Sequence, residues 1–130
     1  MLRLRGNKLT WLGHSTFRIT TPSGKVALID PWVVSNPRCP DALKKLERVD
    51  IMLITHGHGD HFGDAVALAQ QHKPQIVAIY ETVAWLASKG VSNTLSMNKG
   101  GTQKVGELEV TMVHALHSNS IEDEGRTVYA

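Results

Sequence analysis

The stretch from Ile51 to Gly63, which reads IMLITHGHGDHFG, constrains the fold and the chemistry of this chain more than any other. It begins with four apolar residues, which predict a buried strand. Three histidines and one aspartate follow in the spacing H-x-H-x-D-H, with a glycine on each side of His58. Imidazole and carboxylate groups are ligands that Zn²⁺ and similar divalent metals accept. A histidine-rich polar loop without a ligand role is the alternative, but the order strand, glycine loop, helix favours a metal site.

The spacing also indicates how these side chains can converge. Residues two apart in an extended segment point the same way, so His56 and His58 can present their imidazoles to one point. We expect both glycines of the motif to use their tolerance of positive φ to fold the backbone back. That turn would bring Asp60 and His61 to the same place from another side. All four are candidate metal ligands.

Length and composition describe a single domain over residues 1–130. Apolar residues make up 42% of the chain and charged residues 20%, as in ordinary globular proteins. The net charge is only +2 and the basic residues are scattered, which argues against a nucleic-acid partner. A lone Cys39 in a proline-rich loop fits a reducing compartment, and we interpret it as a loop residue rather than a metal ligand or nucleophile. Apolar runs are too short for a membrane span, so we predict a cytoplasmic protein. We also expect a small-molecule substrate.

The hydrophobic pattern predicts a sheet with helices on one side. Strands are expected over 8–12, 16–21, 26–29, 51–54, 75–80, 104–105, 108–115 and 126–130, and helices over 41–48, 64–72 and 81–89. The order of these elements is typical of an α/β or α+β fold. The last strand runs to the end of the chain, which is unusual for a complete domain.

Other chemically active residues leave alternatives open. His114 and His117 follow a predicted strand, and from spacing alone either can supply a further imidazole or be a surface histidine. Asp30 ends a strand, where it can accept the second N–H of a ligand histidine or cap the following proline turn. His14 lies between two strands, where a loop histidine is the default and a pocket-lining role the alternative. His72 at a helix end is expected to be structural.

The motif T-H-G-H-G-D-H after an apolar strand resembles the metal-binding signature of the metallo-β-lactamase superfamily. More narrowly, four other segments resemble a bacterial branch of metal-dependent hydrolases that is similar to the L-ascorbate-6-phosphate lactonases. These segments are Gly13-His14-Ser15, Asp30-Pro31, Met97-Asn98-Lys99-Gly100-Gly101 and Ala115-Leu116-His117-Ser118.

This resemblance implies a role for each matching residue. His56, His58 and His117 match the ligands of a first metal, whereas His114 matches none. Asp60 and His61 match ligands of a second metal, and Asp60 would also orient the attacking hydroxide. Asp30 matches an acidic residue that supports the site. Zn²⁺ is the metal implied, with Mn²⁺ and Fe²⁺ as alternatives.

The superfamily pattern continues with a bridging aspartate and a last histidine, both from a second αβ half. This chain has no segment that matches them; Asp123 lies in an acidic stretch that we expect to be a loop. The resemblance therefore implies the N-terminal αβ half of an αββα sandwich. One face of its sheet would be left exposed, and we expect a homodimer to cover it. The second metal position, with only Asp60 and His61, is expected to bind weakly.

The function implied is a metal-dependent hydrolase in which metal-bound hydroxide attacks a lactone or another carboxylic ester. Two alternatives remain: a phosphodiesterase, and an inactive metal-binding half-domain that needs a partner chain.

Overall fold

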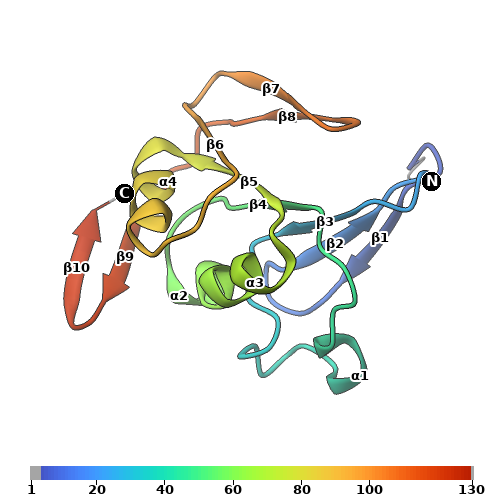
Figure 1. Cartoon of the computed structure of the whole chain (residues 1–130), viewed down its shortest axis with the longest axis horizontal. Helices are drawn as coiled ribbons and strands as arrows, with labels where there is room; N and C mark the ends of the chain where they lie inside the picture. Colours follow the sequence, from blue (N-terminus) through green and yellow to red (C-terminus); the bar gives the residue numbers. More distant parts are fainter. Residues whose placement is uncertain (1–3, 130) are drawn as a thin grey trace.

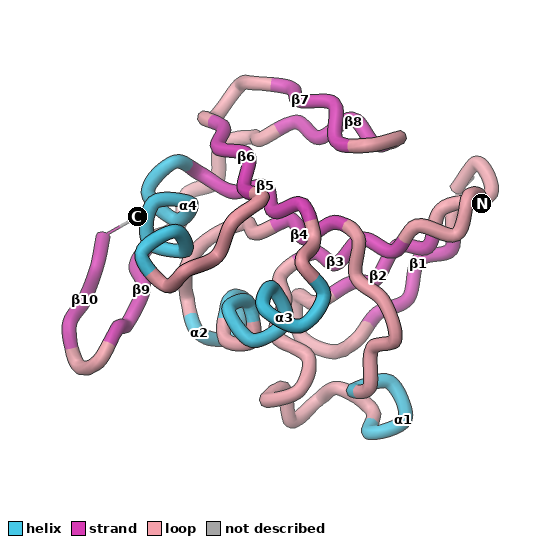
Figure 2. Tube along the Cα trace, viewed as in Figure 1, coloured by secondary structure: helices cyan, strands magenta, loops and turns pink. Residues whose placement is uncertain are grey.

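The computed structural model describes residues 4–129 and contains a six-stranded sheet whose spatial order follows the chain (Figures 1 and 2). The first three strands are antiparallel, and the third to the sixth are parallel. The strands are β1 (Lys8–Trp11), β2 (Phe17–Thr20), β3 (Val26–Ile29), β4 (Ile51–Leu53), β5 (Gln75–Ile79) and β6 (Thr94–Met97).

Helices connect the parallel strands, as parallel pairing requires. Between β4 and β5 lie α2 (Gly59–Phe62) and α3 (Ala65–His72), and α4 (Tyr80–Ser88) joins β5 to β6. The short helix α1 (Asp41–Lys44) precedes β4. The predicted mixed sheet with helices is therefore confirmed.

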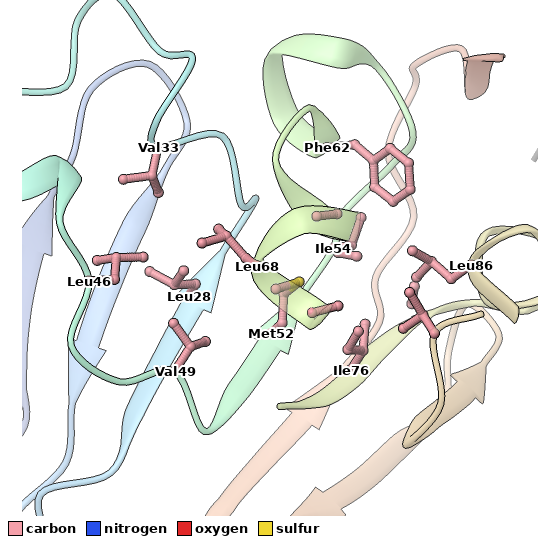
Figure 3. Close-up of a cluster of buried hydrophobic side chains, with 14 of the residues drawn as sticks. Leu28, Val33, Leu46, Val49, Met52, Ile54, Phe62, Leu68, Ile76 and Leu86 are labelled. Atoms are coloured by element: carbon pink, nitrogen blue, oxygen red, sulfur yellow. The ribbon is translucent and has the colours of Figure 1, made fainter. Parts of the chain in front are cut away.

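The central strands β3, β4 and β5 divide their side chains between two separate cores, as the period of two requires. Leu28, Met52 and Ile76 point to the helical side, where they pack with Leu68 of α3 and Leu86 of α4 (Figure 3). The intervening residues face the opposite side in a second, smaller cluster: Ala27, Ile51 and Val77.

A hairpin of β7 (Thr102–Val105) and β8 (Leu108–Thr111) covers part of that second face (Figure 1). Val105 is fully buried there. The expectation of a bare sheet face is therefore corrected for the part around Ile51, Val77 and Met97, which the chain's own hairpin shields from water.

A second hairpin, β9 (Ser120–Asp123) and β10 (Arg126–Tyr129), lies beside α4 (Figure 1). Asp123 of β9 accepts hydrogen bonds from Trp85 Nε1 at 2.9 Å and Lys89 Nζ at 2.7 Å. The prediction of a loop around Asp123 is therefore wrong.

Several predicted boundaries also change. The helix expected over 41–48 ends at Lys44, because Lys45 is extended and the following segment buries Leu46 and Val49. Strand β6 and helix α2 were not predicted.

Cys39 is buried in the main core, apart from the histidines, and burial raises the pKa of its thiol. None of the helices in residues 4–129 has the length and apolar character that a membrane crossing requires.

Candidate metal centre

The candidate site forms where the parallel strands β3 and β4 end side by side. Asp30 directly follows β3, and Thr55 and His56 follow β4. The Asp30 N–H donates to Leu53 O at 2.9 Å, which fixes the two strand ends to one another. Functional groups commonly gather at the carboxyl edge of a parallel sheet.

Asp30 is a buried residue whose carboxylate connects the ends of the two strands to the histidines. Its backbone has φ 51°, a left-handed conformation that aspartate tolerates better than most residues, and the residue is only 2% exposed. Its carboxylate accepts from Thr55 N at 2.8 Å, Thr55 Oγ1 at 2.9 Å and His61 Nδ1 at 2.7 Å. Of the two roles predicted for Asp30, the hydrogen bond to His61 supports the one in which it orients a histidine.

These bonds also set the tautomers of two histidines. A carboxylate only accepts, so His61 Nδ1 carries the proton and leaves Nε2 with a free lone pair. Thr55 donates its hydroxyl hydrogen to Asp30, so His56 Nδ1–H donates to Thr55 Oγ1 across 2.9 Å. His56 Nε2 is then left as an acceptor, and it is buried without a hydrogen-bond partner among the described residues. Asp30 therefore orients the His61 ring directly and the His56 ring through Thr55.

The first donor cluster consists of His56, His58 and His117, whose ligand atoms all lie within 4.8 Å of one another. The ring centroids are 4.6 Å apart for His56–His58, 4.7 Å for His56–His117 and 5.0 Å for His58–His117. His114 is exposed and is not in the cluster, so geometry separates the two histidines that spacing left equal.

The second cluster consists of His14, Asp60 and His61. His14 Nε2 lies 3.0 Å from Asp60 Oδ2, and the two clusters adjoin because the His56 and His61 rings are 4.0 Å apart. Helix α2 turns the chain so that His58 faces one cluster while Asp60 and His61 face the other.

His14 is the site residue for which the sequence interpretation favoured a plain loop role. It has φ 51°, and its carbonyl accepts from Trp11 Nε1 at 2.8 Å. Gly13 before it has φ 96° and packs so tightly that a Cβ would lie 2.7 Å from the Arg38 backbone. A histidine that its surroundings hold in the left-handed backbone region favours a functional role. The only sequence hint was the segment Gly13-His14-Ser15.

Electrostatics favour the neutral form of His56. Burial, reinforced by the neighbouring His61 and His58, lowers the pKa of His56 to about 4. Burial raises the pKa of Asp60. The opposing effects of its backbone N–H and of the His61 and His14 imidazoles are larger together, so the pKa is lowered overall. Neutral imidazoles and an ionised carboxylate are the forms that bind metal. The nitrogen and oxygen donors, together with the unpartnered His56 Nε2, fit a divalent cation such as Zn²⁺.

Glycine is required at position 57 for a reason other than the expected positive φ. Neither Gly57 nor Gly59 has a φ in the left-handed region, so the expectation of positive φ is wrong. A Cβ on Gly57 would overlap the Ile121 side chain and lie 2.9 Å from Ser120 O. Glycine is needed because β9 passes directly over the loop between His56 and His58.

Comparison with known proteins agrees with this geometry. Residues 8–129 match the family model described as a beta-lactamase superfamily domain. A protein of Koribacter versatilis named as a UPF0173 metal-dependent hydrolase is 59% identical over 126 residues, covering 97% of this chain and 54% of that protein. A similarly named protein of Solibacter usitatus is 56% identical over 122 residues, or 94% of this chain and 53% of the relative.

Among solved structures, the chain is similar to Igni18, a metallo hydrolase from Ignicoccus hospitalis. The TM-score is 0.76 with 33% sequence identity, over 87% of this chain and 50% of Igni18. The chain thus spans about half the length of the relatives it matches.

Proposed function

This chain belongs to the beta-lactamase superfamily, and from that premise we propose that it carries the metal centre of a hydrolase that cleaves a lactone or another carboxylic ester. The observation that carries the proposal is the pair of adjoining donor clusters at the carboxyl ends of β3 and β4. The names of the relatives, metal-dependent hydrolases, support the same reaction class.

A divalent ion would polarise the ester carbonyl and lower the pKa of a bound water toward neutrality, so that this water can act as nucleophile. His56, His58 and His117 would hold one ion, and His14, Asp60 and His61 a second. Zn²⁺ suits these donors best, although Mn²⁺ and Fe²⁺ accept them as well.

The protein's own residues supply order and access. Asp30 and Thr55 hold the rings of His61 and His56 in the tautomers that leave Nε2 available. The Asp60 side chain is 49% exposed, so its carboxylate can both face an ion and orient the attacking water. The exposed position of His117 leaves the first cluster open to a substrate on one side.

The test measures hydrolysis and metal content on the same preparation. Purified protein loaded with Zn²⁺, Mn²⁺ or Fe²⁺ is assayed against a lactone, an aryl ester and an aryl phosphodiester. We expect ester cleavage that a chelator removes and added metal restores. His58→Ala is expected to lose it by at least about 100-fold, as loss of a unit in a catalytic constellation does. His72→Ala, at the end of α3, serves as the matched control.

Three outcomes would overturn the proposal. Ester cleavage that survives chelation would remove the metal from the reaction, and cleavage of the phosphodiester alone would favour the phosphodiesterase. Bound metal without hydrolysis of any substrate would favour a metal-binding half-domain that needs a partner. Sedimentation of the same sample tests the expected homodimer.

A further inference from the structure

We infer that Lys99 binds an anionic group, a carboxylate or a phosphate, on the substrate of this hydrolase. The inference rests on the proposed function for the identity of its ligand as a substrate. It deepens that function by assigning a charge to the part of the substrate that does not react.

The first observation is a cleft of about 360 Å³ that borders the first donor cluster. Its lining includes His56 and His117 together with Ile79, Met112, Val113 and Lys99. A cleft with an apolar wall and a few polar groups is the usual form of a small-molecule site. An ester whose carbonyl lies at the histidines would extend along the apolar wall.

The second observation is that the turn following Lys99 is hydrogen-bonded to Met112, which also lines the cleft. Gly100 N–H donates to Met112 O at 2.7 Å, and Met112 N–H donates to Gly101 O at 3.1 Å. Gly100 has φ 87°, which allows the tight turn between β6 and β7. These bonds attach the turn that follows Lys99 to Met112, a residue of the apolar wall.

The third observation is charge. The cleft is lined by no aspartate or glutamate, and Lys99 makes no ion pair or side-chain hydrogen bond within residues 4–129. Lys25, Lys44 and Lys89 are paired with aspartates. Within residues 4–129 the other lysines also lack an ion pair, and Lys99 differs from them in lining the cleft. A cleft with apolar walls and charge of one sign attracts the opposite charge in its ligand. Because Lys99 acts on a group remote from the scissile bond, it should contribute to KM rather than to kcat.

The experiment uses three esters of one length: phenyl hexanoate, phenyl hydrogen adipate and phenyl 5-phosphonopentanoate. For the two anionic esters we expect Lys99→Ala to raise KM about tenfold, the loss of one charge-assisted contact, with kcat unchanged. Phenyl hexanoate should not respond, and Lys99→Arg should restore most of the affinity. Lys104→Ala, at an exposed lysine of β7 that does not line the cleft, is the control. The adipate and phosphono arms show which anion is preferred. Equal effects on the neutral and anionic esters, or none, would overturn the inference.

A binding measurement separates this inference from the proposed function. Adipate and hexanoate are titrated into metal-loaded protein by calorimetry, where no hydrolysis is needed. We expect adipate to bind about tenfold more tightly than hexanoate, and Lys99→Ala to abolish that preference. If no ester is cleaved but this preference exists and is lost in Lys99→Ala, the proposed function fails and the anion site stands. An unchanged preference in Lys99→Ala overturns the site itself.

Discussion

The Gly57 N–H donates a hydrogen bond of 2.8 Å to Asn119 Oδ1, and this bond joins the two segments that carry the first donor cluster. Gly57 lies between His56 and His58, and Asn119 lies two residues after His117. Sixty-two positions separate the partners in the chain, so their bond fixes a long-range contact directly at the site. We therefore predict that Asn119 helps to position His117.

Asn119→Ala should weaken metal binding without removing any donor. Residues that orient ligands typically contribute about 10–100-fold to metal affinity, and we expect a loss in that range. Asn119→Asp keeps the acceptor oxygen and should retain most of the affinity. Competition with a chromophoric chelator measures the change, and Asn98→Ala in the exposed turn before Lys99 is the control. Equal affinity in the alanine variant and the parent would contradict the positioning role.

Gly57→Ala should destabilise the fold, because its Cβ would overlap Ile121, a residue only 2% exposed. Overpacking of this kind costs about 1–3 kcal/mol. Gly59→Ala is the matched control, since a Cβ there meets no atom within 4 Å. Thermal unfolding of the metal-free forms should show a lower midpoint for Gly57→Ala alone. If the two variants unfold alike, β9 does not pack over the loop as described.

Local pattern was enough to predict the central part of the sheet. Strands β3, β4 and β5 are short runs of β-branched and aliphatic residues that end at polar ones, which marks a buried parallel strand. Strand β6 reads Thr-Leu-Ser-Met and carries little such signal. Its conformation depends on pairing with β5. Strand β9 contains Glu122 and Asp123, and it forms because it pairs with β10 and buries Ile121.

The site residues also divide into those that local spacing predicted and those that it did not. His56, His58, Asp60 and His61 were predictable because they lie within six residues and share one local geometry. His14 lies 46 positions before Asp60, so no local spacing connects the two. They come together because Phe17 pairs with Ile29, which puts the β1–β2 loop at the same sheet edge as the end of β3. Asn119 was missed for the same reason.

The pH dependence of stability should include a contribution from Asp50, remote from the metal centre. Burial raises the pKa of Asp50, but hydrogen bonds from Arg48, Val26 N–H and Lys25 lower it to about 2 from an ordinary 3.8. The folded state therefore keeps this carboxylate ionised at pH values where the unfolded state is protonated. The resulting stabilisation is complete above about pH 4 and is lost as the pH falls toward 2.

We expect Asp50→Asn to lower the free energy of unfolding by on the order of 1 kcal/mol at pH 7, since Arg48 and Lys25 are half-exposed and screened by solvent. The difference from the parent should shrink as the pH is lowered below 4. Asp41→Asn, whose 96% exposed side chain meets only Lys44, should show no such trend. Urea unfolding at a series of pH values measures both. A difference that is independent of pH would mean that charge is not the cause.

We predict that His14 determines how many metal ions the centre holds. With Asp60 and His61 alone, the second position would offer two donors, and weak binding was the expectation. The structure adds His14, whose Nε2 is 3.0 Å from Asp60 Oδ2, so that position has three donors, as many as the first. We therefore expect two divalent ions per chain at saturating Zn²⁺ rather than one.

His14→Ala should reduce the stoichiometry from two ions to one, with the second ion weakened by at least about tenfold. His58→Ala should instead weaken the first ion, because it removes a donor from the other cluster. Equilibrium dialysis against buffered Zn²⁺ distinguishes the two sites, and His72→Ala should match the parent. The competing interpretation is that His14 and Asp60 form a simple ion pair. In that case His14→Ala would bind as much metal as the parent, and the second cluster would not be a metal site that includes His14.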